Sequence, residues 1–188
     1  MVKTRVRVIL LALSLLGGAC AVATAADGQT TPSENQVKAA FLAKFAAYVN
    51  WPPAAIGAPG DPIQLCILGR DPFGAELDQT VVRQRVDLHP LLVRRLAGTA
   101  GTAGCHLAFL GGSPTQSVAA MEEALRGKPI LTVTDGSLGT ERGMVHFMLK
   151  DGRVRFHIDD ARAGQSNLAI SARLLSLALT VKSRTQPS

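Results

Sequence analysis

Apolar side chains recur at every second position along residues 145–150 and 153–158, on either side of Asp151-Gly152. An Asp-Gly pair is typical of a two-residue hairpin turn, because a type I′ turn needs positive φ at both central positions. We therefore predict an antiparallel hairpin in which Lys150 pairs with Arg153. One face is then wholly apolar and is expected to be buried: Val145, Phe147, Leu149, Val154, Phe156 and Ile158. The other face is basic and is expected to contact solvent: His146, Met148, Lys150, Arg153, Arg155 and His157.

A helix is predicted over residues 34–49. Ser33 and Gln36 form a capping-box pattern at its start, and Trp51-Pro52-Pro53 ends it. A helical period places one apolar stripe on this helix: Val37, Ala40, Phe41, Phe45 and Tyr48. Lys44 falls inside that stripe, either with its charged end reaching solvent or as a buried cation with an acidic partner.

Strands and helices are predicted to alternate along the rest of the chain. Short apolar runs predict strands over residues 63–68, 91–95, 106–110 and 129–134. Helices are expected after Asp71-Pro72 with Asp71 as the cap, over residues 115–126, and after Ser171 as far as Val181. This order predicts an α/β fold: a single compact domain with a mostly parallel sheet flanked by helices, and the C-terminal hairpin as an antiparallel pair at one edge.

Residues 1–25 have the three regions of a signal peptide: a positive start, an apolar stretch too short to span a bilayer, and the small-x-small sequence ATA at residues 23–25. We expect export to the periplasm and one folded domain over residues 26–188. A buried N-terminal helix is the alternative. The sequence LGGAC ending at Cys20 loosely resembles a lipoprotein cleavage site, so lipid anchoring through Cys20 is a second, less favoured alternative.

Cleavage after residue 25 would change both the charge and the cysteine count. It would remove three cations and no acid, so the formal net charge would fall from +6 to +3. The sequence has no concentrated basic stripe, and no nucleic-acid partner is expected. Cys66 and Cys105 would be the remaining cysteines. An even pair in an oxidising compartment favours a disulfide, and two buried free thiols are the alternative.

The motifs of enzymes are missing from the sequence. It has neither a G-x-S-x-G nucleophile elbow nor a P-loop, so we expect no enzyme activity and no cofactor. Asp71, Ser113 and Asp135 each follow an apparent strand, and ligands commonly bind at the carboxyl ends of parallel strands. These three residues are therefore candidates for a small polar ligand pocket. Alternatively, Asp71 and Ser113 cap helices and Asp135 opens a turn.

His146 and His157 face each other directly in the predicted hairpin. They are weak candidates for a zinc or copper site, because a stable site needs a third or fourth ligand. Asp159 lies on the same side of the strand, two residues beyond His157. The alternatives are two solvated histidines, or a pH-sensitive pair whose rings repel once both are protonated below pH about 6.5.

The basic face of the hairpin is also a candidate protein-binding surface. Interfaces favour arginine, methionine and aromatic residues. This preference indicates Met148, Arg153, Arg155 and His157 as candidate partner-binding residues, together with Trp51 beside its two prolines. An ordinary solvated face and a tryptophan packed against the core are the alternatives.

Five blocks of the sequence together resemble the YfiR-like family of exported bacterial proteins. They are ENQVKAAFLAKFAAYVNWP at 34–52, LCILGRDPFG at 65–74, GCHLAFL at 104–110, ILTVTD at 130–135, and residues 143–178. The resemblance implies a compact α/β sandwich, a disulfide between Cys66 and Cys105, and a homodimer as in the best-known member. That member has a second cysteine pair near the hairpin. It has no counterpart here, which puts redox switching through such a pair in doubt.

The resemblance also implies a function. The best-known member is a periplasmic negative regulator that binds the periplasmic domain of an inner-membrane diguanylate cyclase, which lowers cyclic-di-GMP signalling and biofilm formation. An OmpA-like outer-membrane lipoprotein can titrate it away. We therefore expect a cyclase or another sensor with a periplasmic domain as the partner. The alternative is a periplasmic small-ligand or metal-binding module, with a pocket at the strand ends or at His146 and His157, that serves a sensor or transporter.

Overall fold

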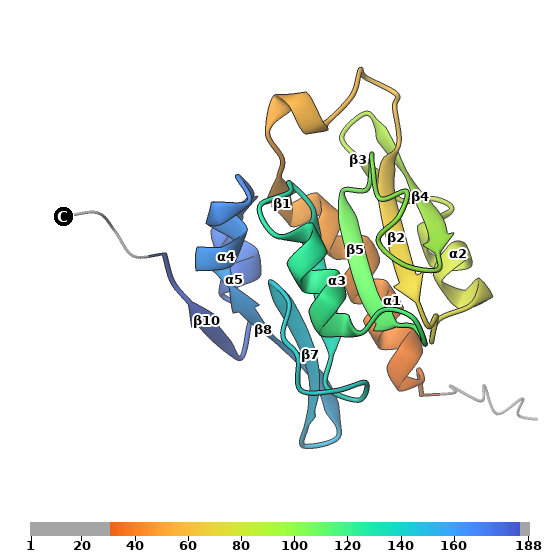
Figure 1. Cartoon of the computed structure of the whole chain (residues 1–188), viewed down its shortest axis with the longest axis vertical. Coiled ribbons are helices and arrows are strands. Elements are labelled where there is room, and N and C mark those ends of the chain that lie inside the picture. The colour runs from red at the N-terminus through yellow and green to blue at the C-terminus, as the bar shows by residue number, and fades with distance from the viewer. Residues whose placement is uncertain (1–30, 185–188) are drawn as a thin grey trace, which may run out of the picture. The chain divides into compact units, whose positions relative to one another are not determined.

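The computed structural model of the protein describes residues 31–184 (Figure 1). The predicted signal peptide and Cys20 lie outside these residues. The compact unit begins at Pro32. Within residues 31–184, no helix combines the length and the apolar character that a membrane crossing requires.

Short helices and strands alternate along the chain. The helices are α1 (Glu34–Phe45), the 3-10 helices η1 (Ala46–Tyr48) and η2 (Pro53–Ala55), α2 (Ala75–Val81), α3 (Val118–Leu125), α4 (Asp160–Gln165) and α5 (Ala172–Leu175). The strands are β1 (Val49–Asn50), β2 (Ile63–Gly69), β3 (Arg85–Val86), β4 (His89–Leu96), β5 (Leu107–Gly112), β6 (Leu131–Asp135), β7 (Val145–Lys150), β8 (Arg153–Asp159), β9 (Ala169–Ile170) and β10 (Thr180–Lys182).

An eight-stranded sheet in the order β10-β8-β7-β6-β5-β2-β4-β3 forms the centre of the fold. Strands β4, β2, β5, β6 and β7 pair in parallel. Strand β8 is antiparallel to β7, and β3 is antiparallel to β4. β1 and β9 form a separate two-stranded sheet. The predicted α/β fold with a mostly parallel sheet is therefore confirmed.

The hairpin of β7 and β8 has the predicted register but not the predicted place at the edge. Lys150 pairs with Arg153 and His146 with His157. The turn residues have positive φ, 51° at Asp151 and 67° at Gly152, as a type I′ turn requires. Beyond β8 lies β10, which pairs with it in parallel and forms the edge of the sheet.

The last helix is shorter than predicted, and this explains the extra strand. We expected a helix as far as Val181, but α5 ends at Leu175. The chain then turns, and the amide of Leu179 donates a hydrogen bond to the carbonyl of Phe156 at 2.8 Å. Thr180 and Val181 are β-branched and favour the extended backbone that pairs with the outer side of β8.

Helices cover the two faces of the sheet, and each face has its own apolar cluster. Figure 1 shows α1 behind the sheet and α3 in front of it. The larger cluster joins α1 to the sheet and includes Phe45, Phe109 and Phe147. The smaller one places Met121 and Leu125 of α3 against β2 and β5. On the α3 side of the sheet, no helix among the described residues covers Arg153 and Arg155 of β8, and both side chains are exposed.

Two residues of the hairpin depart from the predicted burial. Leu149, expected in the core, is 52% exposed, because the tip of the hairpin extends beyond the side chains that could cover it. His146, expected at the solvent-facing side, is only 6% exposed. The loop before β7 folds against it: the amide of Gly143 and a ring nitrogen of His146 both hydrogen-bond to the hydroxyl of Thr134.

Helix α1 has the predicted capping box at Ser33 and Gln36, but its buried side is rotated from the predicted stripe. The stripe was right in part: Phe45 is buried, and Val37, Phe41 and Tyr48 are partly buried against the core cluster. The buried side chains are Lys38, Ala39, Leu42, Ala43 and Phe45. Apolar residues occur on more than one side of this helix, so periodicity alone does not determine which side meets the sheet.

The segments after β2 and β8 also differ from the sequence prediction. Helix α2 begins at Ala75, not at Pro72, because Asp71 accepts the amides of Phe73 and Gly74 and so closes a turn before the helix. Helix α4, which no sequence pattern indicated, follows β8 directly. Asp159 caps it by accepting the amide of Arg162.

Candidate functional site

Four polar side chains form a row across neighbouring strands, on the side of the sheet that faces away from α1. Thr134 of β6, His146 of β7, His157 of β8 and Thr180 of β10 are successive partners in the sheet register. Nδ1 of His146 lies 2.9 Å from the hydroxyl of Thr134, and Nδ1 of His157 lies 2.5 Å from that of Thr180. The imidazole centroids are 6.4 Å apart, with an interplanar angle of 20°. The threonines thus orient both rings by their Nδ1 atoms.

The surroundings of both imidazoles disfavour the protonated form. Burial lowers the pKa of His146, and the positive charge of Arg142 lowers it further. Burial also lowers the pKa of His157, again with a contribution from Arg142. Because an ordinary histidine has a pKa near 6.5, a downward shift leaves the ring uncharged and its lone pair available at neutral pH.

Met148 lies beside this pair, whereas Asp159 does not. The thioether Sδ of Met148 is 2.8 Å from Nε2 of His157. Asp159 instead caps α4 and pairs with Lys182 at 3.1 Å. Among the residues that the structure describes, no three His, Cys, Asp or Glu side chains gather as a metal site would require. A thioether is thus the third side chain close to the two histidines.

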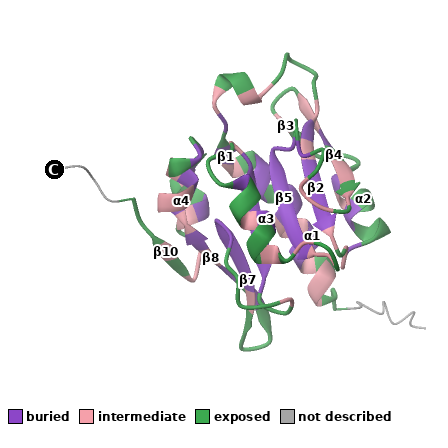
Figure 2. Ribbon diagram, in the orientation of Figure 1, coloured by how far each residue is buried: buried purple, intermediate pink, exposed green. Residues whose placement is uncertain are grey.

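The tip of the hairpin presents three exposed cations. Figure 2 shows this tip as an exposed region below the buried part of the sheet. Lys150, Arg153 and Arg155 lie there, with Leu149 exposed next to them. Of the candidate partner-binding residues, Met148 and His157 are partly buried and adjoin these cations. The hairpin therefore combines positive charge with accessible apolar surface.

Trp51, the other candidate for partner binding, lies in the core cluster. Its side chain is 8% exposed, and its indole N–H donates a 3.0 Å hydrogen bond to the carbonyl of His106. This leaves little of the indole surface accessible to another protein.

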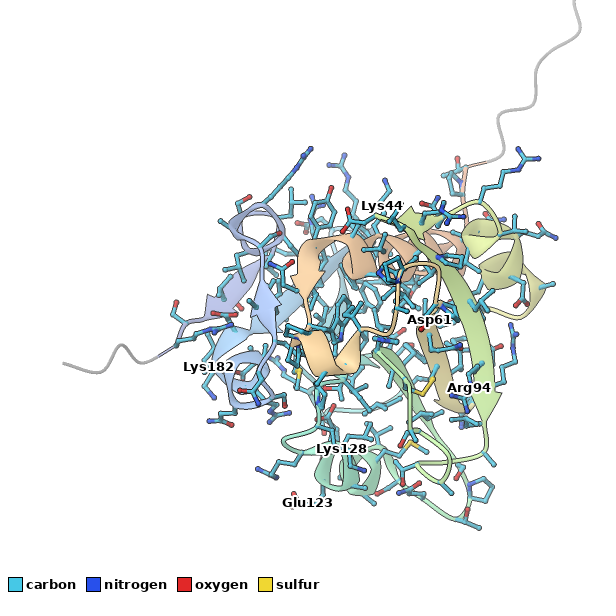
Figure 3. All side chains as sticks on the ribbon, turned by 90° about the horizontal axis from the view of Figure 1, so that it is seen from above. Lys44, Asp61, Arg94, Glu123, Lys128 and Lys182 are labelled. Carbon is cyan, nitrogen blue, oxygen red and sulfur yellow. A yellow bond between two sulfur atoms is a disulfide. The ribbon has the colours of Figure 1, made fainter. Side chains whose placement is uncertain are left out.

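A buried ion pair connects α1 to the sheet. Lys38 is 1% exposed, and its ammonium donates to Glu34 and, at 2.5 Å, to Asp135 at the end of β6. The buried cation considered for Lys44 thus exists at Lys38, while Lys44 is exposed at the outer side of α1 (Figure 3). The predicted stripe did not include Lys38, and only the fold brings Asp135 to it.

The candidate pocket residues Asp71, Ser113 and Asp135 end the neighbouring strands as predicted, but each has local partners. Asp71 accepts a 2.7 Å hydrogen bond from Arg95. Burial opposes ionisation of Asp71, yet the bonds from Arg95 and two backbone amides outweigh it, so its pKa is lowered. Ser113 accepts the amide of Gln116, and Asp135 accepts that of Ser137 as well as the ammonium of Lys38.

Ser113 and Asp135 line neighbouring hollows at the carboxyl edge of the sheet. Ser113 lines an open groove of about 750 Å³ where β2 and β5 end. Asp135 lines an adjacent hollow of about 390 Å³. The backbone of Gly111 approaches that of Arg70 closely beside this groove, and this approach requires glycine: a Cβ on Gly111 would lie 1.9 Å from the carbonyl oxygen of Arg70. Asp71 lines neither of these two hollows.

A third hollow involves residues that the sequence did not indicate. Glu122 of α3 lines it and lies 3.2 Å from Arg162 of α4. Burial raises the pKa of Glu122, although Thr132 and Arg162 oppose the shift. No sequence motif surrounds Glu122. Its contact with Arg162 exists only because α4 packs beside α3 in the fold.

A disulfide links Cys66 of β2 to Cys105 just before β5, with Cα atoms 5.9 Å apart (Figure 3). It lies in the cluster beneath α3, and both sulfurs are buried. The predicted pairing is therefore present in the structure.

The ring of His106 predicts a pH-dependent stability. Its Nδ1 accepts the amide of Gln64 at 3.0 Å, which leaves Nε2 to donate to the carbonyl of Ala55 at 2.8 Å. Burial lowers the pKa of this ring below the value near 6.5 of an unfolded chain. The unfolded state therefore binds more protons below pH 6.5. Folding stability is complete above that pH and falls as the pH drops toward the folded pKa, by at most about 1.4 kcal/mol per pH unit for each such histidine.

Urea unfolding at pH 7.5 and pH 5.0 measures this effect. We expect the wild type to lose stability at pH 5.0, and His106→Gln to lose less on the same change of pH. Arg83→Gln, at an exposed position, is the control and should retain the wild-type dependence. An unchanged dependence in His106→Gln would show that this ring does not contribute.

Comparison with known proteins gives one family. The description of that family is YfiR/HmsC-like, and its profile matches residues 35–179 of this chain. Comparison with curated individual proteins gives no match. The match covers α1, the sheet as far as β8, and both helices that follow it. The chain therefore belongs to the YfiR/HmsC-like family.

Proposed function

We propose that this protein is an exported negative regulator that acts in the periplasm. It binds the periplasmic domain of an inner-membrane diguanylate cyclase, or of another membrane sensor, and thereby lowers cyclic-di-GMP signalling and biofilm formation. Membership in the YfiR/HmsC-like family supports this proposal, because the best-known member of that family is such a periplasmic regulator. An OmpA-like outer-membrane lipoprotein and a second copy of the chain are further proposed partners.

The observation that carries the proposal beyond the family is the basic tip of the hairpin. Lys150, Arg153 and Arg155 are exposed beside Leu149, which is 52% exposed. Interfaces combine apolar contact with charge complementarity, and arginine and methionine are enriched in them. We therefore assign this surface to an acidic patch of the partner, with Met148 and His157 at its border.

Inhibition by binding requires that the regulator distinguish two states of its partner. A ligand shifts an equilibrium only by the difference between its affinities for the two states. The regulator must therefore bind the inactive form of the sensor more tightly than the active form. Such an effect is stoichiometric.

Affinity capture from membranes of the native host tests the proposal. The wild-type protein should retain a cyclase or sensor with a periplasmic domain, identified by mass spectrometry. Replacing Lys150, Arg153 and Arg155 together by Glu should weaken binding of that domain by about 100-fold or more, because like charges would then oppose each other.

The matched control reverses three exposed cations elsewhere: Arg83, Arg85 and Lys128. It changes the net charge equally and should bind like the wild type. Equal binding by both triple variants would exclude the hairpin as the contact surface. Absence of any sensor among the captured proteins would contradict the regulatory function itself.

A second candidate function is small-ligand binding, which the open groove at Ser113 favours. The groove lies between β2 and β5, and the helices that follow these strands pack against opposite faces of the sheet. Ligands in open α/β sheets bind at such a switch point. A thermal-shift screen of small periplasmic metabolites tests this function. A stabilising compound whose effect survives Ser113→Ala and Ser117→Ala would place its site elsewhere.

A further inference from the structure

Three side chains that carry possible metal-binding atoms lie on the same face of the hairpin. His146 and Met148 alternate with core residues along β7, and His157 lies opposite His146 on β8. Nε2 of His157 is 2.8 Å from Sδ of Met148, and the two imidazole centroids are 6.4 Å apart. We propose that His146, Met148 and His157 form a binding site for a single Cu(I) ion. This inference does not depend on the regulatory function proposed above.

The ligand types favour Cu(I) over the commoner divalent metals. A thioether is a soft ligand that selects Cu(I), and imidazole suits copper as well. Zinc sites use thiolate, imidazole and carboxylate ligands, usually four in number. Within residues 31–184 no third His, Cys, Asp or Glu joins the two histidines, and Asp159 is held by Lys182 and by α4. A low-coordinate soft ion therefore fits this set better than Zn(II).

Thr134 and Thr180 supply the hydrogen bonds that hold metal-binding histidine rings in place. Histidine ligands almost always use their other ring nitrogen in a hydrogen bond that holds the ring in place. Thr134 and Thr180 contact Nδ1 of His146 and His157, so a metal would bind through Nε2 of each ring, and Nε2 of His157 would exchange its contact with Met148 for the ion. A hydroxyl both donates and accepts, so Thr180 can accept a proton on Nδ1 when Nε2 of His157 binds a cation.

The charges around the rings also favour a monovalent ion. Arg142 and Lys38 oppose positive charge at His146, and Asp135 favours it. Arg142 also opposes positive charge at His157. Because the repulsion scales with the charge of the bound ion, Cu(I) suffers about half the penalty of Zn(II).

The site is enclosed on one side and accessible on the other. His146 is 6% exposed, whereas Met148 and His157 are partly exposed at the uncovered sheet face. A cation can therefore enter from solvent beside β8 and reach His146 last. Met148 has three rotatable bonds, so its sulfur can adjust its distance from His157 without moving the strand.

Anaerobic competition with the chromophoric chelator bicinchoninate tests the site. The full protein, purified from the periplasm of an expression host with its disulfide intact, should remove one equivalent of Cu(I) from the chelator. Met148→Leu keeps the shape of the side chain and should lower Cu(I) affinity by at least about 10-fold, and His157→Phe by at least about 100-fold. Zn(II) in tenfold excess should not displace the bound Cu(I).

Two controls make the result decisive. His89→Asn alters a histidine on β4, remote from the hairpin in the sheet order, and should leave Cu(I) affinity unchanged. In the protein loaded with Ag(I), a redox-inert substitute for Cu(I), nitrogen NMR should show shifts at Nε2 of His146 and His157. Failure to take Cu(I) from the chelator, equal affinity in Met148→Leu, or displacement by Zn(II) would overturn the proposal. Thermal unfolding of Met148→Leu should match the wild type, so that lost affinity reports the ligand and not the fold.

Discussion

Replacing Lys38 by Met is expected to lower the free energy of unfolding by about 3–5 kcal/mol, as removal of one partner from a buried ion pair does. Lys38 is 1% exposed, and its ammonium binds Asp135, whose side chain is 3% exposed. Met fills much of the volume of the lysine stem but offers no donor. Asp135 would then keep a buried charge with only the amide of Ser137 to stabilise it. Urea unfolding at pH 7.5 measures the loss.

The same helix supplies the control for this prediction. Lys44 is exposed, so Lys44→Met should change stability by no more than about 0.5 kcal/mol. The double variant Lys38→Met/Asp135→Asn removes both charges and keeps an acceptor for Ser137. It should be more stable than the sum of the two single changes predicts, by about 0.5–3 kcal/mol, because the two residues are in contact. Equal effects of Lys38→Met and Lys44→Met would show that the ion pair does not hold α1 in place.

The hairpin shows how much of the fold follows from local sequence. Its turn needs positive φ at Asp151 and Gly152, and strict alternation places only one set of side chains in the core. Both constraints act within 14 residues, so register and facing pairs follow without knowledge of the rest of the chain. The exposure of Leu149 does not follow, because it depends on how far the hairpin extends beyond the core.

The burial of Lys38 shows where local reasoning ends. A lysine is rarely buried without a partner, so the apolar stripe predicted from periodicity did not include Lys38. The partner that makes burial possible, Asp135, is 97 residues away in the sequence. Only the packing of α1 across the end of β6 brings them together. Once that contact exists, it favours the orientation in which the side of α1 that carries Lys38 faces the sheet.

Part of the site on the hairpin follows from local sequence, as the register of the hairpin does. The pairing of His146 with His157 follows from the register, and so does the presence of Met148 on the same face. The approach of the Met148 sulfur to His157 depends on side-chain rotamers, and Thr180 enters the row only because β10 pairs with β8. The segment that forms β10 was predicted as helix, so the contact between Thr180 and His157 could not be predicted.

Removing the disulfide is the other change with a large expected effect. Cys66→Ala/Cys105→Ala should lower the free energy of unfolding by about 4 kcal/mol, since the bond closes a loop with a sequence separation of 39. Both cysteines also pack in the cluster beneath α3, so the lost sulfurs add a packing contribution. Wild-type protein unfolded in urea with dithiothreitol separates the two effects. The difference between oxidised and reduced wild type measures the cross-link, and the difference between reduced wild type and the double variant measures packing. If reduction leaves the stability unchanged while the double variant is destabilised, the cysteines act here through packing and not through the covalent bond. We expect instead that reduction of the wild type accounts for most of the loss of stability, because the main effect of a cross-link is to restrict the unfolded chain.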